Sequence, residues 1–210
     1  MVAVSESPSR QEQKGRTREA ILNAALELSG THGFAQISLR QVSRQAGIVP
    51  TAFYRHFESM DELGLALVER SFLTLRTMIR EAQRDPQVFE NIIDASAEVL
   101  VRVVKQNRMH FAFVARERAS GSAAVREAIQ RELELFISEL AVVLARLPNI
   151  ETWSSEDVKL ASGLFVRNMV YRAEQVVQMP EGRPDREEEI TRKARREMRL
   201  IVLGFEKWQS

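Results

Sequence analysis

Apolar residues recur every three or four positions along most of this 210-residue chain. This spacing puts them on one face of an α-helix, whereas the strict alternation of a half-buried strand, bounded by turn residues, is hard to find. The segment that contains Ile21, Leu22, Ala25 and Leu28 is typical. The chain is therefore predicted to be all-α, with about nine helices.

Prolines and capping residues divide this pattern into segments. Ser38 with Gln41, and Ser59 with Glu62, have the spacing of a capping box, in which two side chains satisfy amides at a helix start. Pro50 suits the first position of a helix, because the amide at that position is unpaired anyway. Residues 5–13 are expected to fray, and helices are expected over 16–31, 38–45, 50–57, 59–84, from Asp85-Pro86 to 106, around 109–114, from 123 to 147, from 154 to 178, and beyond a breaker at 179–184.

The expected helices change in length near Glu58. This change divides the chain into a three-helix, helix-turn-helix domain over 1–58 and a larger helical domain over 59–210. Lys and Arg total 30 against 29 Asp and Glu, so any surface for a charged partner must be local. The absence of Cys excludes a disulfide framework, a Cys-ligated zinc site and thiol catalysis. The three histidines lack metal-ligand spacing and no nucleophile stands with a base, so neither a metal site nor a catalytic site is predicted.

The hydropathy pattern bears on where the protein acts. Met1–Arg10 is polar and lacks the apolar stretch of a signal peptide. No later run approaches the ~18 apolar residues that a membrane span requires. We therefore expect a soluble, cytoplasmic protein without a membrane partner.

The segment 29–57 contains no acidic residue, yet it carries Arg40, Arg44 and Arg55. A phosphate-facing surface needs this charge bias, because each neutralised phosphate releases counterions. Residues 38–48 fit a helix, a sharp turn and the start of a second helix. A helix-turn-helix that binds double-stranded DNA is predicted, although the polar face of a small three-helix bundle would show the same spacing.

The helix expected over 50–57 leaves a polar face when its apolar residues turn inward. Thr51 and Ala52 are then placed to contact a thymine methyl group, and Arg40 can reach guanine with two donors. Tyr54, His56 and the amide that starts the preceding helix suit phosphates, which fix register rather than sequence. The predicted DNA-facing residues are Ser38, Arg40, Arg44, Pro50, Thr51, Ala52, Tyr54, Arg55 and His56, and the predicted inward wedge is Leu39, Val42, Ile48, Phe53 and Phe57.

The run SLRQVSRQAGIVPTAFYRHFESMDELG, residues 38–64, closely resembles the DNA-binding domain of TetR-family regulators. The triplet of Tyr54, His56 and Phe57 after the turn at Gly47 is the most specific mark of that family. Met60 stands at a position that often carries a lysine in the family, which brings one usual phosphate contact into question. The resemblance implies DNA contacts from Arg40, Pro50, Thr51, Ala52, Tyr54, Arg55 and His56.

Two runs resemble the FabR and DesT subgroup, which controls unsaturated fatty acid synthesis or fatty-acyl desaturation. They are PTAFYRHFESMDELGLALVE from residue 50 and RERASGSAAVREAIQRELELFISELA from residue 116. The resemblance implies a repressor of lipid genes with no cofactor, whose effector is a long-chain acyl-CoA or acyl carrier protein thioester. A second hypothesis is a regulator on the same fold that answers to a drug or quinone. A third is a helical lipid-binding protein or enzyme without a role on DNA.

Apolar residues from several expected helices could line a tunnel for such a ligand. Each of them is also explained by core packing, because an aromatic stripe usually packs. Arg116 and Arg118 lie just before a serine-glycine turn, where they could bind coenzyme A phosphates or form ion pairs across the helix junction; Glu117 favours the second. The predicted ligand-binding residues are Phe72, Leu75, Ile79, Phe89, Ile93, Phe111, Phe113, Val114, Arg116, Arg118, Phe136, Phe165 and Met169.

A helix-turn-helix alone contacts few base pairs, so a homodimer on a palindromic operator is expected. The last two helices are the predicted interface, although packing within one protomer must claim part of each apolar stripe. A ligand is expected to shift the helix from Met60 to Arg84 and so change the separation of the two DNA-reading helices. The predicted dimer residues are Leu164, Val170, Met198, Ile201, Phe205 and Trp208.

Overall fold

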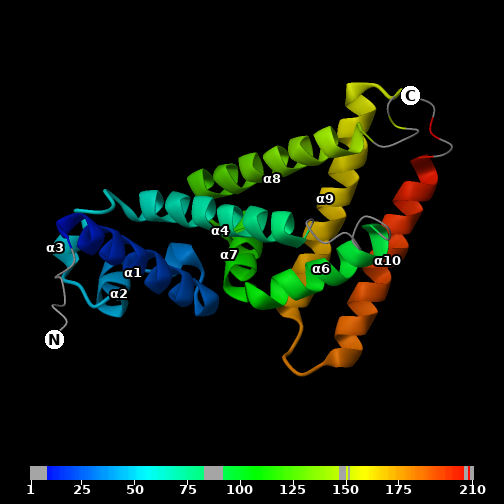
Figure 1. Ribbon diagram of the computed structural model, residues 1–210. Helices are drawn as coiled ribbons and strands as arrows, with labels where there is room; N and C mark the ends of the chain where they lie inside the picture. The colour runs from blue at the N-terminus through cyan, green and yellow to red at the C-terminus, as the bar shows by residue number, and fades with distance from the viewer. Residues whose placement is uncertain (1–8, 83–91, 147–149, 151, 206–207, 209–210) are drawn as a thin grey trace, which may run out of the picture.

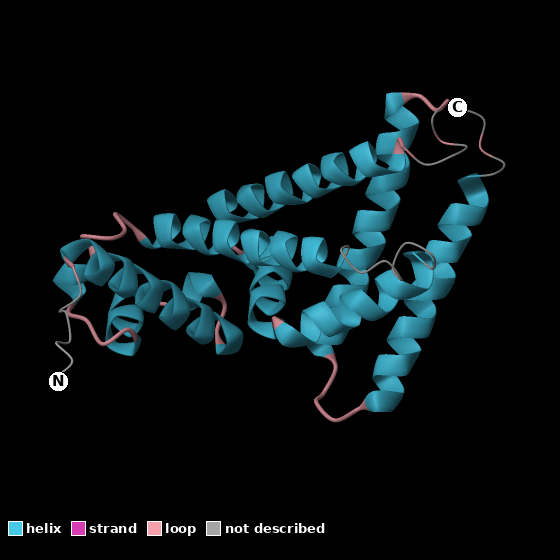
Figure 2. Ribbon diagram, viewed as in Figure 1, coloured by secondary structure: helices cyan, strands magenta, loops and turns pink. Residues whose placement is uncertain are grey.

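The computed structural model describes residues 9–82, 92–146, 150, 152–205 and 208. Across these ranges the chain forms nine α-helices and one short 3₁₀ helix, with no strand (Figures 1 and 2), so the all-α prediction is confirmed. The helices are α1 Arg10–Thr31, η1 Phe34–Gln36, α2 Leu39–Gln45, α3 Pro50–Phe53, α4 Met60–Ala82, α6 Ile92–Gln106, α7 Arg108–Ser120, α8 Ala123–Leu144, α9 Ser155–Gln178 and α10 Pro184–Phe205.

Helix α1 begins at Arg10 rather than near residue 16, so the expected fraying is wrong from Ser9 onward. The Ser9 hydroxyl accepts from the Glu12 amide at 3.2 Å, and the Glu12 carboxylate accepts from the Ser9 amide at 2.7 Å. This capping box satisfies two amides that would otherwise lack a partner. The apolar pattern starts only later in the helix, which is why periodicity alone places the start too late.

The predicted turn between α2 and α3 is present. Ser38 and Gln41 form the expected capping box, with the Ser38 amide donating to the Gln41 side chain at 2.8 Å. Gly47 has a φ of 68°, a left-handed conformation that glycine adopts without steric cost. Pro50 occupies the start of α3, but α3 ends at Phe53 instead of residue 57, and hydrogen-bonded turns follow it.

The longer helices follow the predicted bounds with small shifts. The hydroxyl of Ser59 accepts from the Glu62 amide at 3.1 Å at the start of α4. Helix α9 begins at Ser155, directly after the predicted cap Ser154, and ends at the predicted Gln178. Helix α7 is longer than the predicted segment 109–114, and α8 ends at Leu144 instead of 147. The helix start predicted at Asp85-Pro86 lies outside the described residues.

The three N-terminal helices gather at one end of the molecule, and α9 and α10 lie at the other (Figure 1). Helices α4, α7 and α8 lie between the two ends. Phe72 of α4 contacts Phe136 of α8, with ring centres 5.8 Å apart. Arg76 of α4 pairs with Glu132 of α8 at 2.7 Å. Helix α4 therefore extends from the N-terminal helices into the large domain and is fixed there against α8.

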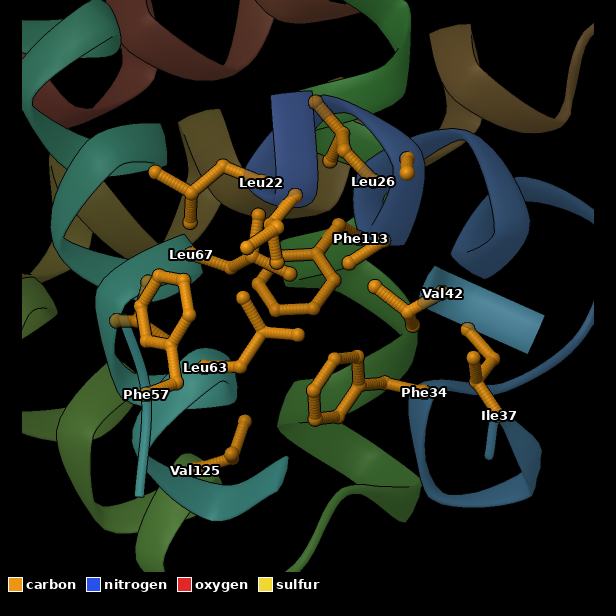
Figure 3. Close-up of a cluster of buried hydrophobic side chains, with 14 of the residues drawn as sticks. Leu22, Leu26, Phe34, Ile37, Val42, Phe57, Leu63, Leu67, Phe113 and Val125 are labelled. Atoms are coloured by element: carbon orange, nitrogen blue, oxygen red, sulfur yellow. The ribbon is translucent and has the colours of Figure 1, made fainter. Parts of the chain in front are cut away.

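One hydrophobic cluster, which we call the junction core, joins the N-terminal helices to α4, α7 and α8 (Figure 3). Within it, Phe34 meets Phe113 edge to face, with ring centres 6.0 Å apart. Its side chains come from both sides of residue 58, so hydrophobic burial holds the two parts of the chain together. The junction core consists of Ile21, Leu22, Ala24, Ala25, Leu26, Phe34, Ile37, Val42, Phe53, Phe57, Leu63, Leu67, Val68, Phe72, Phe113, Val114, Val125, Ala128 and Ile129.

Candidate nucleic-acid interface

The inward wedge predicted from the sequence holds α3 against α2. The amide of Ile48 donates to the carbonyl of Ser43 at 2.9 Å and closes the turn between the helices. The polar residues of α3 are consequently left on its outer side. Val42, Phe53 and Phe57 are buried, and Leu39 and Ile48 pack against the junction core from its edge.

Most of the predicted DNA-facing side chains are accessible. Arg40 and Arg44 of α2 and Arg55 after α3 pair with no carboxylate in the described part of the chain. These guanidinium groups are therefore available to a polyanion. Exposed residues are Ser38, Arg40, Arg44, Pro50, Thr51, Tyr54 and Arg55, and half-buried residues are Ala52 and His56.

Two further cations, Lys14 and Arg18 of α1, lie beside this surface and are absent from the predicted set. The Arg18 guanidinium lies 5.0 Å from the centre of the Phe57 ring. Burial lowers the pKa of His56, and the charges of Lys14, Arg18 and Arg55 lower it further. The four-residue spacing of Lys14 and Arg18, which puts both on one face of a helix, is the signal in the sequence that points to them.

The start of α4 adds no positive charge to this surface. Met60 is half-buried and packs against the junction core. Asp61 and Glu62 follow it in the first turn, and the Glu62 carboxylate accepts from the Glu58 amide at 2.5 Å. Carboxylates at a helix N-terminus interact favourably with the helix dipole, but they repel phosphate. The positive side of the interface is thus formed by α1, α2 and the turn after α3.

Residues 21–67 match the family model of bacterial regulatory proteins, tetR family. The match contains α2, the turn at Gly47, α3 and the exposed residues around them. The chain carries a TetR-type DNA-binding domain. Arg40, Arg44 and Arg55, the accessible cations of the helix-turn-helix, all lie within the matched residues.

Solved structures share the fold of this chain over most of its length. A TetR-like transcriptional regulator from Rhodococcus sp. RHA1 is 21% identical, with a TM-score of 0.62 over 85% of this chain and 93% of that one. The fatty acid degradation regulator FadR from Bacillus halodurans is 14% identical, with a TM-score of 0.67 over 94% and 97%. The SmeT–triclosan complex is 19% identical, with a TM-score of 0.68 over 90% of each chain. The shared fold extends beyond the DNA-binding domain into the large helical domain.

The predicted ligand-binding residues are distributed over several clusters. Phe72, Phe113 and Val114 belong to the junction core, where α4 and α7 meet. Phe111 and Met169 pack against a separate cluster formed by α6, α9 and the start of α10. Packing therefore accounts for these side chains, and a shared tunnel stays a prediction. Leu75 is buried on α4, Phe136 packs against the junction core, Phe165 lies against two further clusters, Phe89 lies outside the described residues, and so do the side chains of Ile79 and Ile93.

Arg116 and Arg118 both have partners within the protein. The Arg116 guanidinium donates to the carbonyl of Ser29, near the end of α1, at 2.8 Å. Arg118 forms an ion pair with Glu174 of α9. Of the two, Arg118 alone forms an ion pair among the described residues, and the choice between the two alternatives open from the sequence is not decided by these contacts. Binding of coenzyme A phosphates by these residues stays a prediction.

Glu117 connects α7 to the segment that precedes α2. Its side chain is 1% exposed and accepts from the Phe34 amide at 2.9 Å. Gly121, just after α7, approaches so closely that an added Cβ would lie 2.6 Å from the Glu117 carbonyl oxygen. On the same helix, His110 Nδ1 lies 2.9 Å from the hydroxyl of Ser71 on α4. Helix α7 therefore contacts both the DNA-binding part and α4.

Packing within the protomer divides the predicted dimer stripe. Leu164 and Trp208 are exposed, and Val170 and Ile201 are half-buried. Met198 is only 2% exposed and packs against Ala97 and Ala194, which removes it from any exposed stripe. The ring of Phe205 likewise packs edge to face on Trp153 and Phe165 of its own protomer. Exposed apolar residues that the prediction missed are Leu160 and Tyr171 on α9 and Leu200 and Leu203 on α10.

A cleft of about 360 Å³ lies between α6 and α10. Lys105 and Glu187 form an ion pair there at 2.6 Å, so its polar lining does not match the apolar tunnel expected for an acyl chain. Among the described residues, no group of three or more Asp, Glu or His side chains is arranged to hold a metal ion. None of the described helices has the length and apolar character needed to cross a membrane. The lining residues are Glu98, Val101, Arg102, Lys105, Gln106, Glu187 and Thr191.

Proposed function

We propose that this TetR-type regulator represses genes of fatty acid synthesis or desaturation, binding a palindromic operator as a homodimer under the control of a long-chain acyl-CoA or acyl thioester. The observation that carries the DNA-binding part is the helix-turn-helix with three exposed guanidinium groups, those of Arg40, Arg44 and Arg55. The second helix of this motif lies in the major groove, where Thr51 and Ala52 would face base edges.

An exposed apolar surface on α9 and α10 supports the homodimer. Leu160, Leu164 and Tyr171 share one side of α9, because side chains four and seven residues apart return to the same helix face. Leu200 and Leu203 are exposed on α10, Leu200 to 69%. Contiguous exposed apolar residues mark association surfaces. The same surface on a second copy of the chain would bury them across a two-fold axis.

The class of effector is inferred from the sequence runs and from two related folds. FadR from Bacillus halodurans is a fatty acid degradation regulator, and the run from residue 116 resembles fatty-acid-responsive repressors. The SmeT structure is a complex with triclosan, a different hydrophobic molecule, so a drug-like effector is the second candidate. Both candidates need apolar surface in the large domain, where the predicted ligand-binding residues lie.

Contacts of α4 supply a route from effector to DNA. Arg70 donates to Asn23 at 2.6 Å and pairs with Glu19 at 3.3 Å, so α4 is tied to α1. The Ser71 hydroxyl ties the same part of α4 to His110 of α7. A displacement of α4 would therefore move α1 and, through α2, which packs on α1, the DNA-reading helix α3. A ligand has this effect only if it binds the two arrangements with different affinities.

A binding assay tests the proposal. Duplexes are first selected from a random library with the purified protein, and affinity is then measured by fluorescence anisotropy at fixed salt. Oleoyl-CoA, palmitoyl-CoA, free coenzyme A and triclosan are added in turn. Opposite effects of the two thioesters support a sensor of acyl saturation. If only triclosan acts, the acyl effector is wrong; if no duplex is enriched, the proposed DNA-binding function fails.

A further inference from the structure

Four basic groups from two parts of the chain converge beside the turn that follows α3. Lys14 and Arg18 belong to α1, and Arg55 and His56 belong to the turn. Arg18 is fixed over the ring of Phe57, at 5.0 Å from its centre, directly next to His56 in the chain. Lys14, Arg18 and Arg55 are near enough that their charges add to the effect of burial in lowering the pKa of His56. The fold alone creates this cluster, because α1 and the turn are distant in sequence.

The acidic side chains of α1 do not neutralise the cluster. Glu12 accepts from the Ser9 amide, Glu19 pairs with Arg70, and Glu27 accepts from the Gln45 side chain at 2.9 Å. No ion pair of Lys14, Arg18 or Arg55 occurs within the described ranges. Like charges held together raise the free energy until an anion binds between them.

The polar atoms of His56 add a second observation. Its Nδ1 atom is buried, and no hydrogen-bond partner for it occurs among the described residues. A buried polar atom without a partner is costly where it stands. The excess positive charge around this ring fits a phosphate group, which offers negative charge and several acceptor oxygens.

We propose that Lys14 and Arg18, which lie beside Arg55 and His56, bind phosphates of the DNA backbone at the α1 edge of the interface. This inference rests on the proposed DNA-binding function and deepens it. The first turn of α4 carries Asp61 and Glu62, so the positive charge that holds the backbone comes from α1 rather than from α4. Such contacts position the protein on the duplex and carry no base preference.

Single substitutions on α1 test the cluster. The variants are Lys14→Gln and Arg18→Gln, and the matched control is Arg16→Gln. Arg16 is exposed, carries the same charge and lies about 200° around the helix from both. It is also not among the groups whose charge acts on His56. Affinity is measured against salt concentration for a selected operator duplex and for a scrambled duplex of the same length.

Loss of one phosphate contact makes the negative slope of log K against log[salt] shallower by about 0.9 per bound protomer. We expect Lys14→Gln and Arg18→Gln to show this loss on both duplexes, and Arg16→Gln to keep the wild-type slope. Phosphate ethylation interference on the operator should lose the same one or two positions in each variant. Lys14→Gln keeps the test valid if Arg18→Gln unfolds, because Lys14 is exposed.

The outcomes separate this inference from the proposed function. If wild-type protein binds an operator with a steep salt dependence and all three variants keep that slope, the phosphate cluster is refuted while the regulator stands. A loss confined to the operator duplex would also overturn the cluster, since it would indicate base contacts. If wild-type protein binds neither duplex, the proposed function fails first.

Discussion

Replacing the buried carboxylate of Glu117 should destabilise the whole protein. In Glu117→Ala the Phe34 amide loses its acceptor and stays buried, which costs about 1.5 to 3 kcal/mol for a bond to a charged group. The methylene lost with the carboxylate removes roughly 0.8 kcal/mol of packing. We expect a decrease of about 3 kcal/mol in the free energy of unfolding. For a chain of this size that corresponds to a melting temperature lower by roughly 6 to 12 °C.

Two matched variants isolate the hydrogen bond. Glu117→Gln retains an acceptor oxygen of similar shape, so it should cost about 1 kcal/mol or less, because a neutral acceptor makes a weaker bond. Glu127→Ala removes a glutamate that is exposed on α8 and should stay within about 0.5 kcal/mol of wild type. Urea unfolding followed by circular dichroism gives all three values on one scale, provided that the slopes with denaturant agree.

The ranking of these variants decides the argument. If Glu117→Ala melts within roughly 1 °C of the exposed control Glu127→Ala, the hydrogen bond to the Phe34 amide contributes nothing measurable and α7 is held by packing alone. If Glu117→Gln is as unstable as Glu117→Ala, the negative charge rather than the acceptor stabilises the junction. Either result would refute the hydrogen-bond account.

Three further changes have defined outcomes. In Gly64→Ala the new Cβ would lie 2.8 Å from Phe34 and 2.9 Å from Val125. Overpacking should cost about 1 to 3 kcal/mol and outweigh the ~1 kcal/mol gained in helix propensity. Calorimetry should therefore show a lower melting temperature, and an unchanged or higher melting temperature would contradict the close approach. Burial, and then the charge of Arg70, lower the pKa of His110 below its ordinary 6.5. Between the folded and the unfolded pKa the unfolded chain binds more protons, so the free energy of unfolding should rise as pH increases towards 6.5. In urea titrations at pH 5 and pH 7, His110→Gln should flatten that rise, and an equally steep rise in the variant would assign it to other groups. Leu164→Glu places a charge on the exposed side of α9. The proposed dimer would bury that charge without a partner at a cost of several kcal/mol, so the dimer affinity measured by sedimentation equilibrium should fall at least about tenfold. An unchanged affinity would place the interface elsewhere.

Local signals made the helix-turn-helix predictable from sequence. The box of Ser38 and Gln41, the left-handed turn at Gly47 and the proline at the start of α3 each act within a few residues, and each is present. The start of α1 was harder to predict because its cap precedes a polar stretch without periodic apolar residues. Sequence patterns are most informative where structure is determined by neighbours along the chain.

Contacts between distant segments were not predictable in the same way. Periodicity places Met198 on the apolar stripe of its helix, but only the packing of α10 on α6 shows that it faces Ala97 of its own protomer. Likewise, nothing near Arg118 in the sequence indicates that Glu174 is its partner. The cations of α1 escaped prediction for a related reason: their four-residue spacing places both on one face of a helix, but only the folded chain brings that face beside the turn after α3.

The junction core also determines how this protein can be re-engineered. Regulators with separable functions invite chimeras, in which the operator specificity of one is fused to the sensor of another. Here the side chains before and after residue 58 interlock in one cluster, so a fusion at that residue would set foreign surfaces against each other. A stable chimera would have to carry along the residues around Phe113 and Val125. The unit that can be exchanged is therefore larger than the helix-turn-helix.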